Sequence, residues 1–287
     1  FVQQHSDWLN RKRLLRPSAV IIPESSLEWW AVEHPHEFYS APGWATPIDM
    51  STPSASHLDL DFLGKLLEGY PDQDLASDVV LGVRYKADLR AQVVIQPHLL
   101  SFLPVQAKYL AEADRFVDRG WTILHSSVPC LPWRSMQCGS VERTLEPGRP
   151  RVTSNASAPH NSVLDADGFE VVPINVAIRQ DLLPKEVKPT TAMIMTAMTI
   201  LLEVAHILGE TVFVMADDFK SYFNQLRLAP SEYHKTGMIH PPRMKAGLTQ
   251  FATDTVLGFG IKMASNVAQR FGTFLVNCMR HIVDREE

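Results

Sequence analysis

The chain has 287 residues, with 27 Lys and Arg against 32 Asp and Glu, so its formal net charge is −5. Apolar residues make up 45% and charged residues 21%, an ordinary composition for a globular protein. This composition excludes collagen-like, coiled-coil and largely disordered chains, and the length allows one large domain or two smaller ones. The slight acidity argues against a uniformly basic nucleic-acid coat but leaves room for a local basic groove.

The cysteines and the apolar runs narrow the cellular context. Cys130, Cys138 and Cys278 form no CxxC pair, which predicts reduced thiols in an intracellular protein. The longest apolar run, residues 192–202, is shorter than the roughly 20 residues that span a bilayer, so no membrane partner is expected. No signal peptide is visible, and the chain begins at Phe1 rather than Met, which predicts a piece of a longer product.

The expected elements follow from periodicity and from turn residues. Residues 1–57 are rich in proline and tryptophan, which predicts an irregular extension packed on the main domain. Helices are expected at 58–67, at 105–117, at 190–208 and from Ser265, as N-cap, to 282, and strands at 121–124, 211–216 and 236–240. A hairpin is expected from strand 140–145, a turn at 146–148 and a return strand from Arg149.

The strand expected at 211–216 ends in two carboxylates, Asp217 and Asp218. Carboxylates delivered to the end of a buried strand can hold Mg²⁺, with phosphate oxygens and water completing its octahedron. An acidic residue after a strand is also common in any α/β turn. The feature by itself therefore leaves catalysis and an ordinary turn both open.

Three segments resemble motifs of reverse transcriptases, in the order in which that family has them. Residues 217–223, DDFKSYF, resemble the first catalytic-aspartate motif, D-x-x-x-[small]-[Y/F]-F. Residues 257–271, LGFGIKMASNVAQRF, resemble the downstream P-F-G-[L/I]-K-x-[A/S]-P-x-x-F-Q-R motif, and residues 141–151 resemble the basic fingers hairpin. Residues 157–163, SAPHNSV, look most like the S-x-P…G-x-S-V-N stretch of DIRS-like retroelements.

The resemblance implies an α+β, right-hand polymerase fold and RNA-templated DNA synthesis. It divides the chain into an N-terminal extension (1–57), a helical lead-in (58–128), the fingers hairpin region (129–179) and a partial palm (180–287). The implied partners are an RNA or DNA template–primer and deoxynucleoside triphosphates. Downstream RNase H or recombinase domains in the full-length product are compatible with it.

By the same resemblance, Asp217 is the catalytic aspartate and binds two Mg²⁺ (or Mn²⁺) ions. Such ions lie about 3.5–4 Å apart and stabilise the attacking and leaving oxygens. Asp218 would add its backbone carbonyl, since side chains alternate along a strand. Asp218 as the catalytic acid is the alternative, but it would put Tyr222 at the small position, where the preferred alignment has Ser221.

Tyr222 then matches the aromatic steric gate beneath the sugar of the incoming nucleotide, with core packing as the alternative. Core packing is the interpretation for Phe223. Arg151 matches the fingers arginine that grips the triphosphate, and Arg143 stands where a lysine is more usual, which keeps the charge but changes the geometry. The alternative for both arginines is a solvated face of the hairpin.

The downstream motif places four further residues in the implied nucleotide-binding site. Gly260 would permit close approach of the backbone to nucleotide or template, and Phe259 and Lys262 flank it. Gln269 would face the templating side, or else a solvated helix surface.

The sequence also departs from the family. Gly258 and Ser265 replace the two prolines of the downstream motif, Ala268 replaces its aromatic residue, and Asn155 replaces the acid common after the fingers arginine. No Asp-Asp pair follows Asp218, so the second acidic motif is missing. Because two-metal chemistry needs more than one carboxylate cluster, we expect this chain to be inactive alone.

Two other classes stay open. One is a catalytically dead retroelement remnant, or a nucleic-acid-binding module that retains the fold. The other is an unrelated α/β phosphoryl-transfer enzyme, which usually carries a Gly-rich phosphate loop; no GxxxxGK or GxGxxG segment is present.

Overall fold

The computed structural model describes residues 20–26, 58–125, 128–130, 132–143, 146–159, 162–184, 189–212, 222–240 and 250–283. Within these ranges, helices and a mixed sheet give an α+β fold, as predicted. The helices are α4 (Leu60–Leu67), α5 (Gln73–Leu81), α6 (Gln106–Asp118), α7 (Ile174–Ala177), α8 (Thr191–Leu208) and α9 (Ala264–Val283). The strands are β1 (Val20–Ile22), β2 (Val93–Ile95), β3 (Thr122–His125), β4 (Trp133–Arg143), β5 (Glu146–Asn155), β6 (Gly237–His240) and β7 (Gln250–Asp254).

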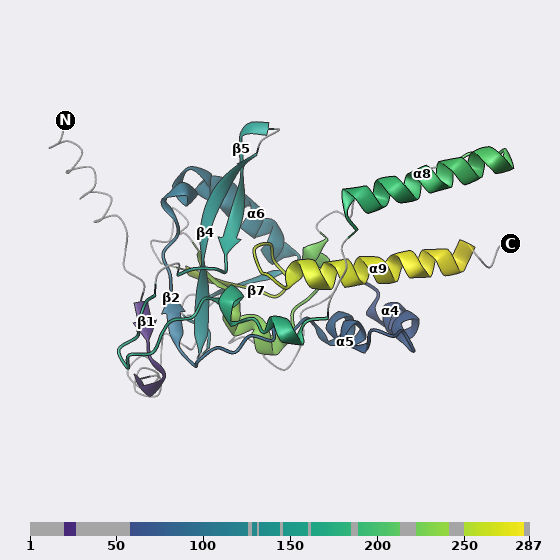
Figure 1. Cartoon of the computed structure of the whole chain (residues 1–287). Helices are drawn as coiled ribbons and strands as arrows, with labels where there is room; N and C mark the ends of the chain where they lie inside the picture. Colours follow the sequence, from purple (N-terminus) through teal and green to yellow (C-terminus); the bar gives the residue numbers. More distant parts are fainter. Residues whose placement is uncertain are drawn as a thin grey trace.

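The seven strands form one sheet in the order β1-β2-β4-β6-β7-β3, and β5 pairs with β4 off this path. Strand β4 is parallel to β2 and to β6, whereas the other pairs are antiparallel. The start of β4, from Trp133 to Met136, lies between β2 and β6, and its remainder pairs with β5. The β4–β5 hairpin therefore extends out of the sheet as a projecting arm (Figure 1).

The hairpin differs from the expectation at its turn. Residues 146–148 were expected as the turn, but β5 begins at Glu146, which pairs with Arg143. The register shifts between Val141 and Arg143, so β5 holds extra residues opposite this part of β4. Pro147 and Pro150 lie in that stretch, and proline has no N–H to donate to a ladder, which explains the irregular pairing.

Helices α4, α6, α8 and α9 lie where hydrophobic periodicity predicted them. Local capping interactions define several of their ends. Asp59 accepts the backbone N–H of Phe62 at the start of α4, and Thr190 accepts that of Met193 at the start of α8. Gly209 ends α8 in the left-handed conformation, with φ of 71°. The prediction of Ser265 as an N-cap is wrong, because α9 begins at Ala264 and Ser265 lies within its first turn.

Two expected segments fall partly outside the described residues. Of the strand expected at 211–216, the structure describes only residues 211–212, which are not in a strand. Of the N-terminal extension it describes residues 20–26, where β1 pairs with β2. Ser25 Oγ also donates to Asp167 Oδ1 (2.7 Å), and Arg90 lies 3.2 Å from Glu24. This short part of the extension thus docks on the main domain.

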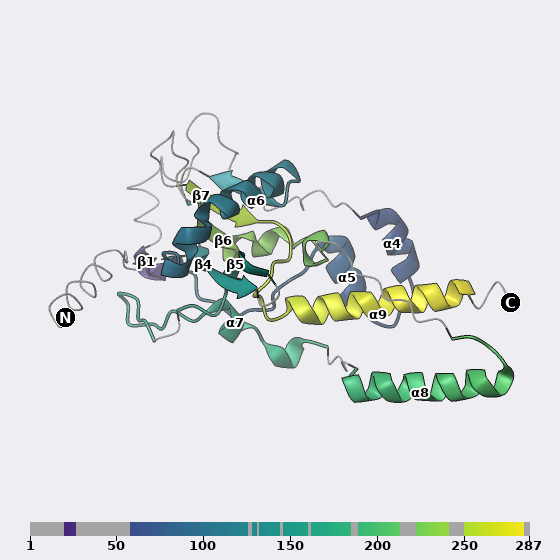
Figure 2. The ribbon, with the colours of Figure 1, turned by 90° about the horizontal axis from the view of Figure 1, so that it is seen from above.

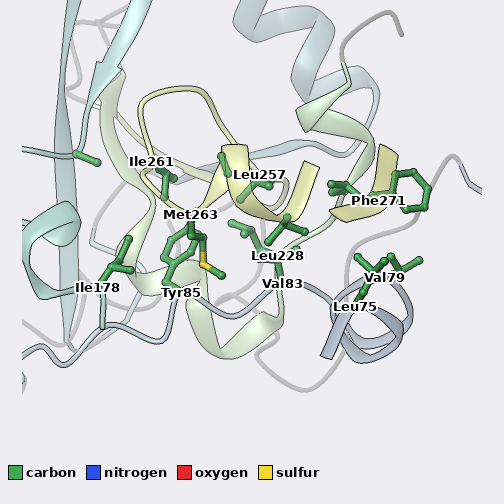
Figure 3. Close-up of a cluster of buried hydrophobic side chains, with 14 of the residues drawn as sticks. Leu75, Val79, Val83, Tyr85, Ile178, Leu228, Leu257, Ile261, Met263 and Phe271 are labelled. Atoms are coloured by element: carbon green, nitrogen blue, oxygen red, sulfur yellow. The ribbon is translucent and has the colours of Figure 1, made fainter. Parts of the chain in front are cut away.

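The largest hydrophobic cluster joins helices α4, α5 and α9 to the segment before β6 and the segment after β7 (Figure 3). Leu75 and Val79 of α5 lie near Phe271 of α9, while Leu228 and Leu257 fill the centre. These side chains are all under 5% exposed. The cluster places the start of α9, and the turn that precedes it, against the body of the protein.

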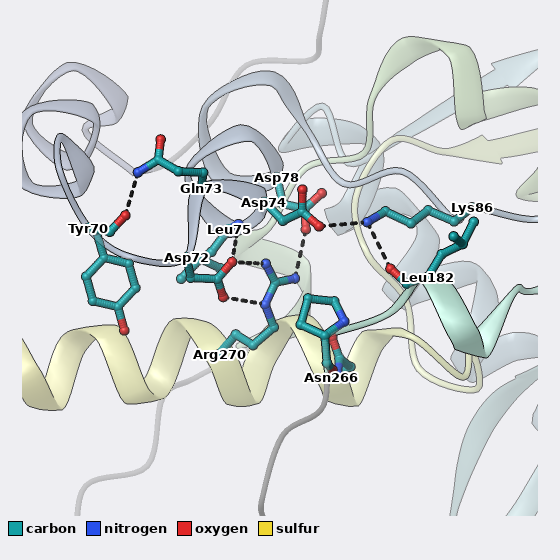
Figure 4. A network of polar contacts seen from close by, with 11 residues as sticks. Tyr70, Asp72, Gln73, Asp74, Leu75, Asp78, Lys86, Leu182, Asn266 and Arg270 are labelled. Carbon is teal, nitrogen blue, oxygen red and sulfur yellow. Dashed lines mark hydrogen bonds and ion pairs between the residues drawn. The ribbon is translucent and has the colours of Figure 1, made fainter.

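A buried ionic cluster also ties α9 to α5 (Figure 4). The Arg270 guanidinium donates to both carboxylate oxygens of Asp72, at 2.7 and 2.6 Å, and to Asp78 Oδ2 at 3.1 Å. The side chain of Arg270 is only 1% exposed. Hydrogen bonding to Arg270 lowers the pKa of Asp72, whereas burial raises the pKa of Asp78. The arginine of the downstream motif is therefore a structural residue here.

Helix α8 is apolar and exposed along almost its whole length, and Ala205 is its only buried residue. Figures 1 and 2 both show α8 apart from the sheet, with its axis roughly along that of α9. It is longer than the apolar run of residues 192–202, and by length and composition it could cross a membrane. Among the described residues it is the one helix that meets this criterion, and a single such helix does not by itself define a membrane protein.

The buried carboxyl group of Asp254, at the end of β7, should make the folding stability of the protein depend on pH. Its carboxylate accepts a hydrogen bond from Thr122 Oγ1 (2.7 Å) across the β3–β7 pair, and burial raises its pKa to about 7. Between about pH 4 and pH 7 the folded state keeps this proton while the unfolded chain releases it. Stability from this group is therefore present at low pH and is lost as the pH rises toward 7.

Asp254→Asn should remove this dependence, because an amide cannot ionise but still accepts the Thr122 bond. Relative to wild type, we expect the variant to gain about 2 kcal/mol in free energy of unfolding between pH 5 and pH 8. Urea denaturation at both pH values measures it. The comparison cancels the opposite contribution of His125, whose pKa burial lowers to about 4. Parallel pH profiles for the two proteins would refute the assignment.

Candidate functional site

The predicted metal ligands Asp217 and Asp218, and the nearby Ser221, lie outside the described residues. Among the residues that are described, no group of three or more His, Cys, Asp and Glu side chains could hold a metal ion. The structure therefore bears on the residues predicted around the nucleotide, and not on the metal ligands.

Tyr222 is fixed against α9. Its hydroxyl donates to the backbone carbonyl of Ala268 (2.8 Å), and its ring stacks on Phe271 with centroids 6.2 Å apart. Burial raises the pKa of Tyr222 to about 12, so the hydroxyl stays protonated and can donate. A ring fixed in this way has a defined edge, which a steric gate requires, and the same contacts also serve core packing.

The neighbouring aromatic residues extend this surface. Phe223 meets Phe259 edge to face, with centroids 4.6 Å apart. Phe223 is half-buried against the main cluster, as predicted, whereas Phe259 is 63% exposed. The aromatic motif after Asp217 and the downstream motif are therefore in contact through their side chains.

The turn at residues 258–262 lies against the end of β5. Gly260 has φ of +90°, a conformation that favours glycine, and a Cβ at this position would collide with the Ser154 carbonyl oxygen. Gly258, in the same turn, has open space around it. The tight space at Gly260 is thus filled by the hairpin backbone, and the approach of a nucleotide or template at this residue stays a prediction.

Asn175 holds this turn through side-chain hydrogen bonds, and it was not among the residues predicted from the sequence. From α7, its Nδ2 donates to Ser157 Oγ and to the Gly260 carbonyl, both at 2.8 Å, and its Oδ1 accepts the Lys262 backbone N–H at 2.8 Å. The sequence offered only its place in the segment after the hairpin.

The remaining predicted residues are placed by their backbone or by exposure. Arg151 pairs with Val141 within the hairpin, and Arg143 lies at its far end, opposite Glu146. Lys262 is exposed, and Gln269 is partly exposed on α9. The structure thus brings together Phe223, the turn and the end of β5, with Tyr222 beside Phe223, whereas Arg143 lies at the far end of the hairpin.

Comparison with known proteins adds no relative. No protein-family model, no curated protein and no solved structure matches the chain.

Proposed function

We propose that the chain is part of a retrotransposon RNA-directed DNA polymerase, most similar to the DIRS-like group, with the fingers and the first part of the palm of a right-hand fold. One observation carries the proposal: segments that resemble three separate family motifs adjoin one another. The turn at 258–262 lies against β5 of the basic hairpin, and its Phe259 contacts Phe223, the neighbour of Tyr222.

The roles follow from this arrangement. The exposed backbone at Gly260 and the fixed ring of Tyr222 would border the incoming deoxynucleotide, and Arg151, nearer the base of the hairpin than Arg143, would bind its triphosphate. Asp217, with the Asp218 backbone, would hold the ions, and Mg²⁺ would supply charge stabilisation at the reacting phosphate. Because the chain carries one of the two acidic motifs, a catalytically dead remnant or a nucleic-acid-binding module is the second candidate.

Both candidates predict salt-sensitive binding of an RNA–DNA hybrid, which filter binding across a salt series measures. Arg151→Ala should weaken this binding several-fold and reduce the salt slope by about one, because one phosphate contact is lost. Arg115→Ala removes the same charge from an exposed position on α6 and should leave binding unchanged. Absence of salt-sensitive binding would contradict both candidates.

Primer extension separates them. We expect none from residues 1–287 with Mg²⁺, since the second acidic motif is missing. In a reading frame that continues past Glu287, an aspartate pair after a strand, together with primer extension, would support the polymerase. A longer product that binds hybrid without extending it would support the remnant or binding module instead.

A further inference from the structure

Asn175 is the residue through which three segments meet. It lies in the short helix α7, which begins after Pro173, and its backbone N–H donates to the Ala156 carbonyl (3.0 Å) at the exit of the hairpin. This backbone bond fixes where the side chain starts. The side chain then reaches across to the turn before α9.

The amide of Asn175 uses its groups in a way that only an amide can. One Nδ2 hydrogen goes to Ser157 Oγ and the other to the Gly260 carbonyl, while Oδ1 accepts the Lys262 N–H. The two contacts to the turn lie on either side of Ile261. They therefore fix the orientation of the peptide group before Ile261 and of the peptide group after it. A carboxylate of the same shape could accept from Lys262 but could not donate to Gly260.

The exposed part of the turn contains its one residue with a left-handed backbone conformation, and few contacts from the body of the protein hold it. Gly260 has a positive φ, and Phe259 is 63% exposed. The turn is tied at one end by the Leu257 N–H, which donates to the Leu226 carbonyl, and at the other by the Ala264 N–H, which donates to Ile261. Between these ends, Asn175 provides the hydrogen bonds that come from outside the turn.

We propose that Asn175 is a positioning residue for the incoming nucleotide: it holds the backbone of residues 258–262 in the conformation that receives the nucleotide. The inference rests on the proposed function, because it assumes that this turn borders a nucleotide. It goes beyond the sequence resemblance, in which Asn175 had no role.

The test uses residues 1–287 bound to an RNA template and a DNA primer that ends in a dideoxynucleotide. The rate of hybrid dissociation is measured with Mg²⁺ and either the complementary or a non-complementary deoxynucleoside triphosphate. For wild type, the complementary nucleotide should slow dissociation about tenfold relative to the other. For Asn175→Ala and Asn175→Asp this ratio should fall to about one, while affinity for the hybrid alone stays within about twofold.

Asn266→Ala is the matched control. Asn266 lies at the start of α9, and its Nδ2 donates to the Pro184 carbonyl (2.8 Å) rather than to the turn. This variant should keep the wild-type ratio. If alanine at position 175 prevents folding, as judged by circular dichroism, the aspartate variant carries the test, because it keeps the size of the side chain and the bond from Lys262.

Hydrogen exchange provides a readout that does not depend on nucleic acid. The Lys262 amide should lose protection about tenfold in Asn175→Ala, because its acceptor is gone, and should keep it in Asn266→Ala. A nucleotide response in the Asn175 variants equal to wild type would overturn the inference. So would wild-type protein that binds hybrid but ignores the nucleotide. Failure of wild type to bind any hybrid would instead overturn the proposed function.

Discussion

Replacing Arg270 by alanine is expected to lower the free energy of unfolding by about 3–5 kcal/mol. The guanidinium satisfies Asp72 through two hydrogen bonds and Asp78 through a third, and its side chain is 1% exposed. Without it, Asp78 would be left buried without its cationic partner, and α9 would lose its polar anchor to α5. Urea denaturation measures the change.

Two further variants test the reason for this effect. Arg270→Lys keeps the charge but not the planar fork, so it should recover only part of the lost stability. Arg179→Ala removes an arginine that also pairs closely with a carboxylate, Asp181 at 2.6 Å, but at the surface. Because exposed ion pairs contribute little, its effect should be a small fraction of that of Arg270→Ala. Equal losses in the two alanine variants would refute a buried, structural Arg270.

Replacing Gly260 by alanine is expected to abolish the slowing of hybrid dissociation by the complementary nucleotide, while affinity for the hybrid alone stays within about twofold. The added Cβ would meet the Ser154 carbonyl oxygen, and L-residues rarely adopt φ of +90°. The turn would therefore have to move away from β5 and from Asn175. The dissociation rate of the same hybrid, with the complementary and with a non-complementary nucleotide, measures the loss.

Gly258→Ala is the control for this prediction. It adds the same methyl group to the same turn, where nothing lies within 4 Å of the new Cβ. We expect a nucleotide response close to that of wild type. If both variants respond alike, the close approach at Gly260 has no role in the site. Thermal unfolding of both proteins distinguishes a moved turn from a general loss of structure.

The elements with strong local signals could be predicted well. The helix ends at Asp59, Thr190 and Gly209 depend on bonds within a few residues, and such signals are readable in the sequence. The hairpin turn could not be predicted in the same way. Proline and glycine at 147–148 indicated a turn, but pairing of Glu146 with Arg143 keeps them in β5, since the register depends on the whole ladder.

The candidate site shows the same division. Tyr222, Phe259 and Gly260 were proposed from motif order, and in the structure Phe223 links Tyr222 to Phe259 through ring contacts. Asn175 was missed because a lone Asn in a short helix has no pattern of its own. Its value comes from a carbonyl 85 positions away, which no local spacing reveals. The motif arginine at 270 was likewise found to pair with Asp72, 198 positions away.

The sequence by itself determined helices α4, α6, α8 and α9 to within a few residues, the approximate hairpin, and a set of residues whose order resembles a polymerase; helices α5 and α7 were not predicted. These properties depend on hydrophobic period and on bonds between near neighbours. Only the tertiary structure decided which side chains are buried, that the turn at Gly260 lies on β5, and that Asn175 and Arg270 hold α9 and its turn in place. The reason is physical. Burial and long-range hydrogen bonds arise when distant segments pack together, and local patterns in a sequence of 287 residues do not specify which distant segments come into contact.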